Sequence, residues 1–177
     1  MKLEKCTPWD ARFLLMCDMI ASWSEDTSRK VGCVIVGPMN EIRATGYNGL
    51  PRGVDSEPQD RHEHLNGEKY LWFEHAERNA IYNAASTGTP IYGCSLYVNS
   101  FPCADCARGL IQSGITELRT FGFDATDSKY GRHFDVSSQM LQEAGVALKL
   151  FDRGDLAIRE QAIAFENARA PENNLLR

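Results

Sequence analysis

The sequence lacks any apolar run long enough to cross a membrane, and its first residues lack the apolar core of a secretory signal. Glu4, Lys5 and Asp10 interrupt the stretch where such a core would lie. We therefore expect neither a membrane protein nor a secreted one, and we predict a cytoplasmic location.

A surplus of positive charge is also missing, because 19 Lys and Arg face 24 Asp and Glu, which gives a net charge of −5. Proteins that bind nucleic acids normally present a basic surface, so this balance argues against a DNA or RNA partner. A small phosphorylated substrate stays compatible with it, since such a molecule needs only a few local cations.

The remaining composition is ordinary for a globular protein, with 43% hydrophobic and 24% charged residues in 177. This length favours one domain over residues 1–177, with a core at about 9–151 and a C-terminal helix at about 155–170. The six cysteines do not form a disulfide framework if two of them bind metal. The other four are expected to be small buried hydrophobic residues: Cys6, Cys17, Cys33 and Cys94.

One motif carries chemistry. His75-Ala76-Glu77 is followed downstream by Pro102-Cys103-Ala104-Asp105-Cys106. One imidazole and two thiolates leave the fourth position of a tetrahedral zinc open, which is the pattern of a catalytic zinc that holds water. Glu77, which is not needed as a ligand, can move protons to and from that water.

The spacing within the motif predicts how it is held. Cys103 and Cys106 would share one face of a helix, with Pro102 in its first turn. His75 and Glu77 are two residues apart, so on a helix they reach one metal only if the ion lies beyond the N-terminus. We therefore predict two helix N-termini that point at one ion, where their dipoles stabilise thiolates.

The motif has two other interpretations. A C-x-x-C pair can be half of a structural zinc site or a redox pair. No second C-x-x-C and no H-x₃₋₅-H pair completes a structural site. Glu77 could be a fourth ligand, but that would leave Pro102 and the flanking sequence unexplained. The catalytic interpretation is favoured.

Apolar periodicity predicts an alternation of helices and strands. A first helix carries Trp9 and Trp23 as core residues, with Thr7 as its N-cap. The further elements are expected to be a hairpin of strands 31–36 and 41–47, a helix at 71–85, a strand at 95–99, a helix at 103–113, a strand at 117–123, a helix at 136–144, a strand at 146–151 and a helix at 156–168. This order predicts an α/β protein whose mixed sheet is covered on both faces, with ligands at the strand ends.

Residues 48–68 show no periodicity and contain prolines, glycines and many charges. A loop of this length in a compact domain is usually a lid or a binding loop. His62, Glu63 and His64 could hold a second, structural zinc, although a solvated part of the insertion is the favoured interpretation.

The motif resembles that of the cytidine deaminase superfamily, whose zinc enzymes share the pattern H-x-E…P-C-x-x-C. Further stretches resemble its deoxycytidylate (dCMP) deaminase branch, and the resemblance covers roughly residues 9–150. These stretches are Ser24-Glu25-Asp26-Thr27-Ser28-Arg29-Lys30-Val31-Gly32, Gly46-Tyr47-Asn48-Gly49-Leu50-Pro51-Arg52-Gly53, His75-Ala76-Glu77-Arg78-Asn79-Ala80-Ile81 and Ser128-Lys129-Tyr130.

The resemblance implies a three-layer αβα cytidine deaminase-like fold with a five-stranded mixed sheet, and a homo-oligomer that is often a hexamer. It implies Zn²⁺ held by His75, Cys103 and Cys106, with Glu77 as the catalytic residue. The implied substrate-binding residues are Ser24, Asn48, Ala76, Pro102, Lys129 and Tyr130. A site for dCTP and dTTP as effectors is implied at Gly46, Tyr47, Asn48, Gly49 and Arg52.

Some of these residues also have simpler interpretations. Asn48 could bind the sugar or form a turn with Gly49, and the two roles are compatible. Tyr130 could stack on a pyrimidine or be a core aromatic residue. Many relatives carry an arginine where this chain has Trp23, so another cation would have to bind phosphate. The candidates are Arg29, Lys30, Arg52, Arg108, Lys129 and Arg132.

The implied reaction is hydrolytic deamination of dCMP to dUMP with release of ammonia, which feeds thymidylate synthesis. The alternatives are deamination of another cytosine nucleotide or nucleoside, such as 5-substituted dCMP or deoxycytidine. A deaminase of tRNA or single-stranded DNA and a non-catalytic zinc protein are less favoured. The first would need a basic groove, and the second has no use for Glu77.

Overall fold

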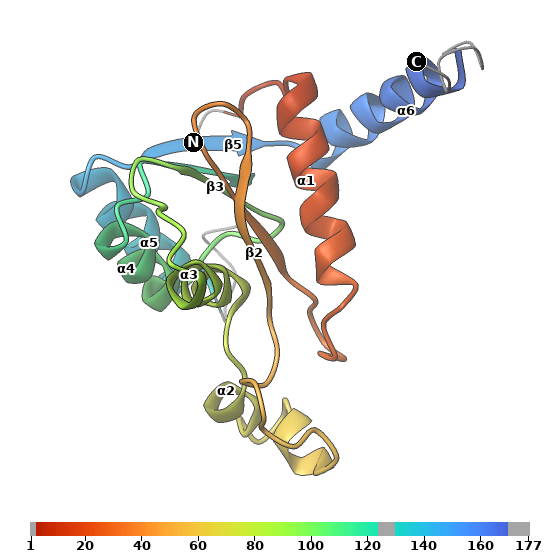
Figure 1. Cartoon of the computed structure of the whole chain (residues 1–177). Coiled ribbons are helices and arrows are strands. Elements are labelled where there is room, and N and C mark those ends of the chain that lie inside the picture. Colours follow the sequence, from red (N-terminus) through yellow and green to blue (C-terminus); the bar gives the residue numbers. More distant parts are fainter. Residues whose placement is uncertain (1–2, 124–129, 170–177) are drawn as a thin grey trace.

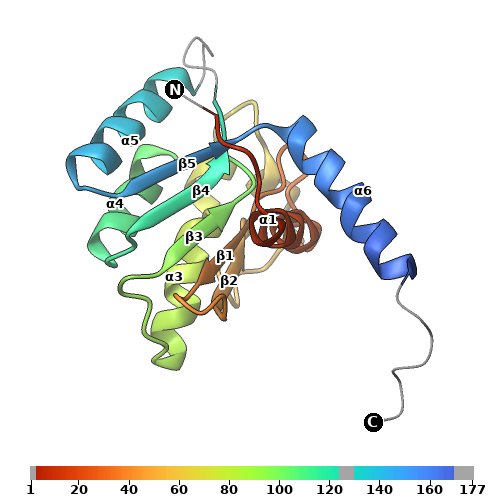
Figure 2. The ribbon, with the colours of Figure 1, turned by 90° about the horizontal axis from the view of Figure 1, so that it is seen from above.

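The computed structural model describes residues 3–123 and 130–169 (Figure 1) and contains a five-stranded sheet in the order β2-β1-β3-β4-β5 (Figure 2). The pairs β2–β1 and β1–β3 are antiparallel, and the pairs β3–β4 and β4–β5 are parallel. The predicted mixed sheet is therefore confirmed. The strands are β1 (Gly32–Val36), β2 (Ile42–Tyr47), β3 (Ser95–Val98), β4 (Glu117–Phe121) and β5 (Ala147–Phe151).

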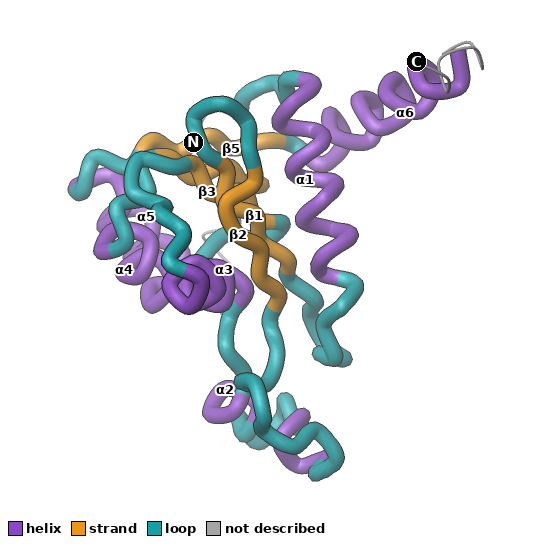
Figure 3. The backbone as a smooth tube through the Cα atoms, viewed as in Figure 1, coloured by secondary structure: helices purple, strands orange, loops and turns teal. Residues whose placement is uncertain are grey.

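Helices cover both faces of the sheet and complete the αβα sandwich (Figure 2). One face carries α1 (Pro8–Ala21) and α6 (Arg153–Arg169), and the other carries α3 (Ala76–Thr87), α4 (Ala104–Gln112) and α5 (Gly131–Glu143). Two smaller elements, η1 (Gln59–His62) and α2 (Lys69–Trp72), lie in the insertion that extends beyond one end of the sheet (Figure 3).

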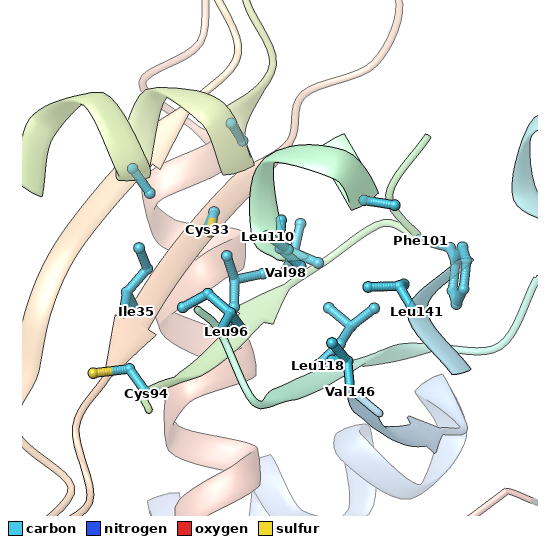
Figure 4. Close-up of a cluster of buried hydrophobic side chains, with 14 of the residues drawn as sticks. Cys33, Ile35, Cys94, Leu96, Val98, Phe101, Leu110, Leu118, Leu141 and Val146 are labelled. Carbon is cyan, nitrogen blue, oxygen red and sulfur yellow. The ribbon is translucent and has the colours of Figure 1, made fainter. Parts of the chain in front are cut away.

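Alternating strand residues supply the two halves of the core. Cys33 and Ile35 of β1 join Leu96 and Val98 of β3 beneath α3, α4 and α5 (Figure 4). Val34 and Val36 point to the opposite face and pack with α1 and α6. Burial of the strands on both faces explains why β1 is a continuous apolar run. The prediction that Cys6, Cys17, Cys33 and Cys94 are buried is confirmed.

The first helix begins as predicted. Thr7 is its N-cap, and a capping box with Asp10 satisfies backbone donors at both residues. The two tryptophans, however, are not core residues, since Trp9 is 49% exposed and Trp23 is 55% exposed. Trp9 lies on the solvent side of Phe13, and Trp23 follows the end of the helix and contacts Tyr47 edge-on.

The single helix predicted at 71–85 is wrong, because residues 73–75 are extended between α2 and α3. The backbone N–H and C=O of Glu74 pair with those of Gly49, at 2.8 and 3.0 Å, so they do not form helical hydrogen bonds. His75 consequently lies at the N-cap of α3, outside the helix. Two further expectations were inexact: α5 begins at Gly131 rather than 136, and the insertion is not wholly irregular.

Candidate active site

The three predicted metal ligands meet at the N-termini of two helices. His75 is the N-cap of α3, Cys103 is the N-cap of α4, and Cys106 lies in the first turn of α4. Their ligand atoms all lie within 4.8 Å of one another, and no second group of this kind occurs in the part of the chain that the structure describes. The predicted convergence of two helix N-termini is confirmed.

The geometry of these ligands fits zinc. His75 Nδ1 lies 3.5 Å from Cys103 Sγ and 3.4 Å from Cys106 Sγ. Tetrahedral zinc with ordinary Zn–N and Zn–S bonds places such nitrogen and sulfur atoms about 3.5 Å apart. One imidazole and two thiolates also leave a fourth position open, as a catalytic zinc requires.

Glu77 is buried beside these ligands, with only 3% of its surface exposed. It lies in the first turn of α3, and its carboxylate is not part of the compact ligand group. Burial raises the pKa of the Glu77 carboxyl, and the neighbouring His75 opposes this effect. A carboxyl with a raised pKa can both accept and donate protons near neutral pH.

The pKa values of the two thiols are shifted in opposite directions. A hydrogen bond from the Cys106 thiol, together with His75, lowers the pKa of Cys103 to about 4. The thiolate of Cys103 raises the pKa of Cys106 in turn. Arg78, held by an ion pair with Glu74, adds positive charge next to both sulfur atoms. This electropositive surrounding favours the thiolate form that binds metal.

A pocket adjoins the ligands, since His75, Glu77 and Cys103 are among its lining residues. It is called the zinc pocket. Its lining combines aromatic side chains with polar groups from residues 26–48 and from the insertion. Tyr130 stacks on Phe134 in this wall, and its hydroxyl lies 3.1 Å from that of Tyr70. The lining residues are Asp26, Arg29, Val31, Asn48, Lys69, Tyr70, Phe73, His75, Ala76, Glu77, Ser100, Phe101, Cys103, Tyr130 and Phe134.

Asn48 lines the pocket but also organises the loop before β1. Its amide donates to Asp26 Oδ2 at 2.7 Å and to the Arg29 carbonyl at 2.9 Å, and its Oδ1 accepts from the Val31 N–H at 2.8 Å. Both amide hydrogens are thus used within the protein. Ser24 donates its hydroxyl to the Asn48 carbonyl at 2.6 Å and does not line the pocket.

The other residues expected to bind substrate are placed unevenly. Ala76 and Tyr130 line the zinc pocket, whereas Pro102 is buried and does not line it. Pro102 also precedes the N-cap of α4 instead of lying in the first helical turn, because the Cys103 backbone is extended. Lys129 lies outside the described residues.

A buried ion pair in the pocket wall was missed by sequence reasoning. Lys69 Nζ lies 2.5 Å from Asp26 Oδ2 and donates to Ser28 Oγ at 2.7 Å. Burial alone would raise the pKa of Asp26, but hydrogen bonds from Lys69 and from backbone amides lower it. Lys69 belongs to the insertion, and nothing in the local sequence indicated that it would reach this loop.

Part of the segment predicted to bind effectors lines a second pocket between the end of β2 and α3, called the β2–α3 pocket. Tyr47, Gly49 and Arg52 line it together with Asn79 and Asn83 of α3. The Arg52 guanidinium donates to Asn83 Oδ1. Gly46 does not line it but has a packing role, because a Cβ there would lie 2.3 Å from the Ala76 carbonyl oxygen.

Two further expectations can be compared with the structure. His62 approaches the Ser56 carbonyl at 3.1 Å and packs edge-on against Phe73. The described residues hold no second metal group around it.

In the described part of the chain, no helix combines the length and apolar character needed to span a membrane.

An αβα sandwich with a His-Cys-Cys ligand set and a buried glutamate defines the class of zinc-dependent deaminases. The model of the cytidine and deoxycytidylate deaminase zinc-binding region matches residues 7–121. The chain belongs to this family, and zinc is its cofactor.

Several known proteins are similar to the chain. An uncharacterized deaminase in the luxG 3′ region of Aliivibrio fischeri is 39% identical over 142 residues, which are 78% of this chain and 90% of that protein. Human deoxycytidylate deaminase is 41% identical over 120 residues, 66% of each chain. The crystal structure of dCMP deaminase from the cyanophage S-TIM5 with dCMP and dUMP has a TM-score of 0.70 at 24% identity, covering 84% of this chain and all of that one, which supports the fold.

Proposed function

We propose that this protein hydrolyses dCMP to dUMP and ammonia. The observation that carries the proposal is the buried Glu77 beside a three-ligand zinc site at the floor of an aromatic pocket. A pocket of this kind suits one flat base, and the relatives named deoxycytidylate deaminase support the choice of cytosine nucleotide.

The protein contributes proton transfer, positioning and exclusion of water. Zinc, when bound by His75, Cys103 and Cys106, supplies a Lewis acid that lowers the pKa of a water ligand to about 7. Glu77 accepts a proton from the attacking water and delivers it to N3 of cytosine. Glu77 then takes the proton of the hydroxyl that has added to C4 and passes it to the amino nitrogen on C4, so that ammonia leaves and the C4 carbonyl of uracil forms. Phe101 and Tyr130 flank the base and keep bulk water away.

Ammonia release from a panel of substrates tests this proposal. The zinc-loaded protein is assayed with dCMP, 5-methyl-dCMP, CMP, dCTP, deoxycytidine and a cytosine-containing oligonucleotide. We expect the highest kcat/KM with dCMP. Faster turnover of the oligonucleotide would indicate a nucleic-acid deaminase, and no turnover at full zinc occupancy would indicate a zinc protein without catalysis.

We further propose that dCTP and dTTP regulate the enzyme through the β2–α3 pocket. The Gly49 backbone in this pocket pairs with Glu74, and Glu74 Oε1 accepts the His75 N–H at 2.7 Å. Occupation of the pocket would therefore act on the backbone that carries a metal ligand. Saturation curves for dCMP with and without each triphosphate test this. Curves unchanged by millimolar dCTP and dTTP would contradict it.

We also propose a homo-oligomer, of which a hexamer is the expected form, in the cytoplasm. Large exposed side chains on α1, just after α1, on β2 and on α3 support self-association: Trp9, Met19, Trp23, Tyr47 and Tyr82. The need for reduced Cys103 and Cys106 supports a reducing compartment. Light scattering of the zinc-loaded protein measures its mass, and a monomer at micromolar concentration would contradict the assembly.

A further inference from the structure

The zinc pocket contains two cations among the described residues, and they differ in their surroundings. Lys69 is 8% exposed and forms an ion pair with Asp26, so its charge is neutralised inside the wall. Arg29 is exposed at the mouth, and its guanidinium carbon lies 5.0 Å from the centroid of the Tyr130 ring. Within the described chain, no carboxylate is recorded within ion-pair distance of this guanidinium.

Arg29 also lines an adjoining pocket, called the cation pocket, which shares Ser100, Phe101 and Phe134 with the zinc pocket. Lys30 and Arg153 contribute two further positive charges, and none of the described lining residues is acidic. Asp18 lies beside this pocket, where it accepts from Asn99 at 2.8 Å and from Arg153 at 3.4 Å. Asp18 offsets the charge of Arg153, so Arg29 and Lys30 are the cations of this pocket for which the described residues provide no ion pair.

The backbone of Arg29 is held in place from both sides. Its N–H donates to Asp26 Oδ1 at 3.2 Å, and its carbonyl accepts from the Asn48 amide at 2.9 Å. The stacked Tyr130 ring supports the side chain as well. The guanidinium is thus positioned before a ligand arrives, which lowers the entropic cost of an ionic contact.

We propose that Arg29 recognises the 5′-phosphate of the substrate, with Lys30 adding positive charge in the adjoining cation pocket. This inference rests on the proposed function, since it assigns the residue that distinguishes a nucleotide from a nucleoside. A base placed at Glu77 directs its sugar and phosphate toward the mouth, where Arg29 lies. The planar guanidinium can bind two phosphate oxygens at once.

The other candidate cations are placed less favourably. Trp23 contributes no cation; it contacts Tyr47 and does not line the zinc pocket. Arg52 binds Asn83 in the β2–α3 pocket, Arg108 forms an ion pair with Asp105, and Arg132 lines neither the zinc pocket nor the cation pocket.

The experiment compares kcat/KM for dCMP and deoxycytidine in the zinc-loaded wild type and in Arg29→Ala, Arg29→Gln and Arg29→Lys. We expect Arg29→Ala and Arg29→Gln to lose about 10- to 100-fold with dCMP and less than about threefold with deoxycytidine. Arg29→Lys should retain an intermediate preference for dCMP, because the positive charge stays while the planar guanidinium that can bind two phosphate oxygens is lost. Arg12→Ala is the matched control, since Arg12 stacks over Trp9 at 5.4 Å on the surface of α1.

Several outcomes would overturn the inference. Equal losses with both substrates would show that Arg29 only positions Tyr130, and unchanged values would place phosphate recognition elsewhere. If Arg29→Ala unfolds at a lower temperature than the wild type, the inference is tested with Arg29→Gln and Arg29→Lys, by the ratio of kcat/KM for dCMP to kcat/KM for deoxycytidine. Binding of dUMP and deoxyuridine, measured by calorimetry, should show the same selective loss. A wild type that does not deaminate dCMP would instead contradict the proposed function itself.

Discussion

At the scale of single residues, Glu77 has the most specific role, because its burial and raised pKa suit proton transfer. We predict that Glu77→Gln keeps zinc and loses turnover by about 10²–10⁴-fold or more, since the amide has the same shape but cannot carry a proton. Metal analysis and ammonia release of the same preparation check this. Near-normal deamination would remove Glu77 from the mechanism.

The thiol ligands should behave differently from Glu77. We predict that Cys103→Ala and Cys106→Ala lose zinc together with activity, because two protein ligands hold the ion far more weakly than three. Cys94→Ala is the control, since Cys94 is buried in the hydrophobic core and lies outside the ligand group. Full zinc occupancy in both ligand variants would mean that the metal is bound elsewhere.

At the scale of elements, the contact between β2 and α3 positions the first ligand. A Cβ at Gly46 would lie 2.3 Å from the Ala76 carbonyl oxygen and 2.4 Å from the Ala80 nitrogen, both backbone atoms. We predict that Gly46→Ala costs about 1–3 kcal/mol of unfolding free energy and weakens zinc binding, because α3 must shift together with His75.

Denaturant titration and zinc competition with a chelator measure these two effects. Gly49→Ala is the control, since the nearest atom to its Cβ would be a Tyr47 ring carbon at 3.7 Å. If Gly46→Ala matched this control in both measurements, close packing of β2 on α3 would not be what places His75.

At the scale of the whole molecule, a buried polar network joins the α1 layer to the sheet. Asp10 of α1 accepts from Arg119 of β4 and, at 3.0 Å, from the Tyr97 hydroxyl of β3. Glu117 continues the network to Arg119 and to Lys149 of β5. Burial would raise the pKa values of Asp10 and Glu117, but hydrogen bonds and cations lower both below their ordinary values.

This network predicts acid sensitivity. Carboxyls whose folded-state pKa is lowered contribute stability above their unfolded pKa of about 4, and the contribution is lost as the pH falls through the folded value. We predict that unfolding free energy falls below about pH 5 and that Asp10→Asn flattens this dependence while lowering stability at pH 7. Asp135→Asn, on the exposed side of α5, is the control. An unchanged pH dependence in Asp10→Asn would contradict the role of the network.

Much of this could be predicted because the relevant information is local in sequence. Apolar periodicity indicates an element wherever one face is buried, so the strands and α1 were found close to their true positions. The ligand motif is as readable, because zinc requires particular atoms, and His75, Cys103 and Cys106 supply them at short spacings. Periodicity does not show whether other elements cover the residues near a helix end, so the prediction that Trp9 and Trp23 are core residues was wrong.

By itself, then, the sequence determined the chemistry of the site, the order of helices and strands, and the family. The tertiary structure decided where α3 begins, because a backbone pairing between Gly49 and Glu74, 25 residues apart, holds His75 outside the helix. It also decided that Lys69 is neutralised by Asp26 while Arg29 faces the pocket mouth. Both depend on contacts between segments distant in the chain, and such contacts form only when the insertion packs against the loop before β1.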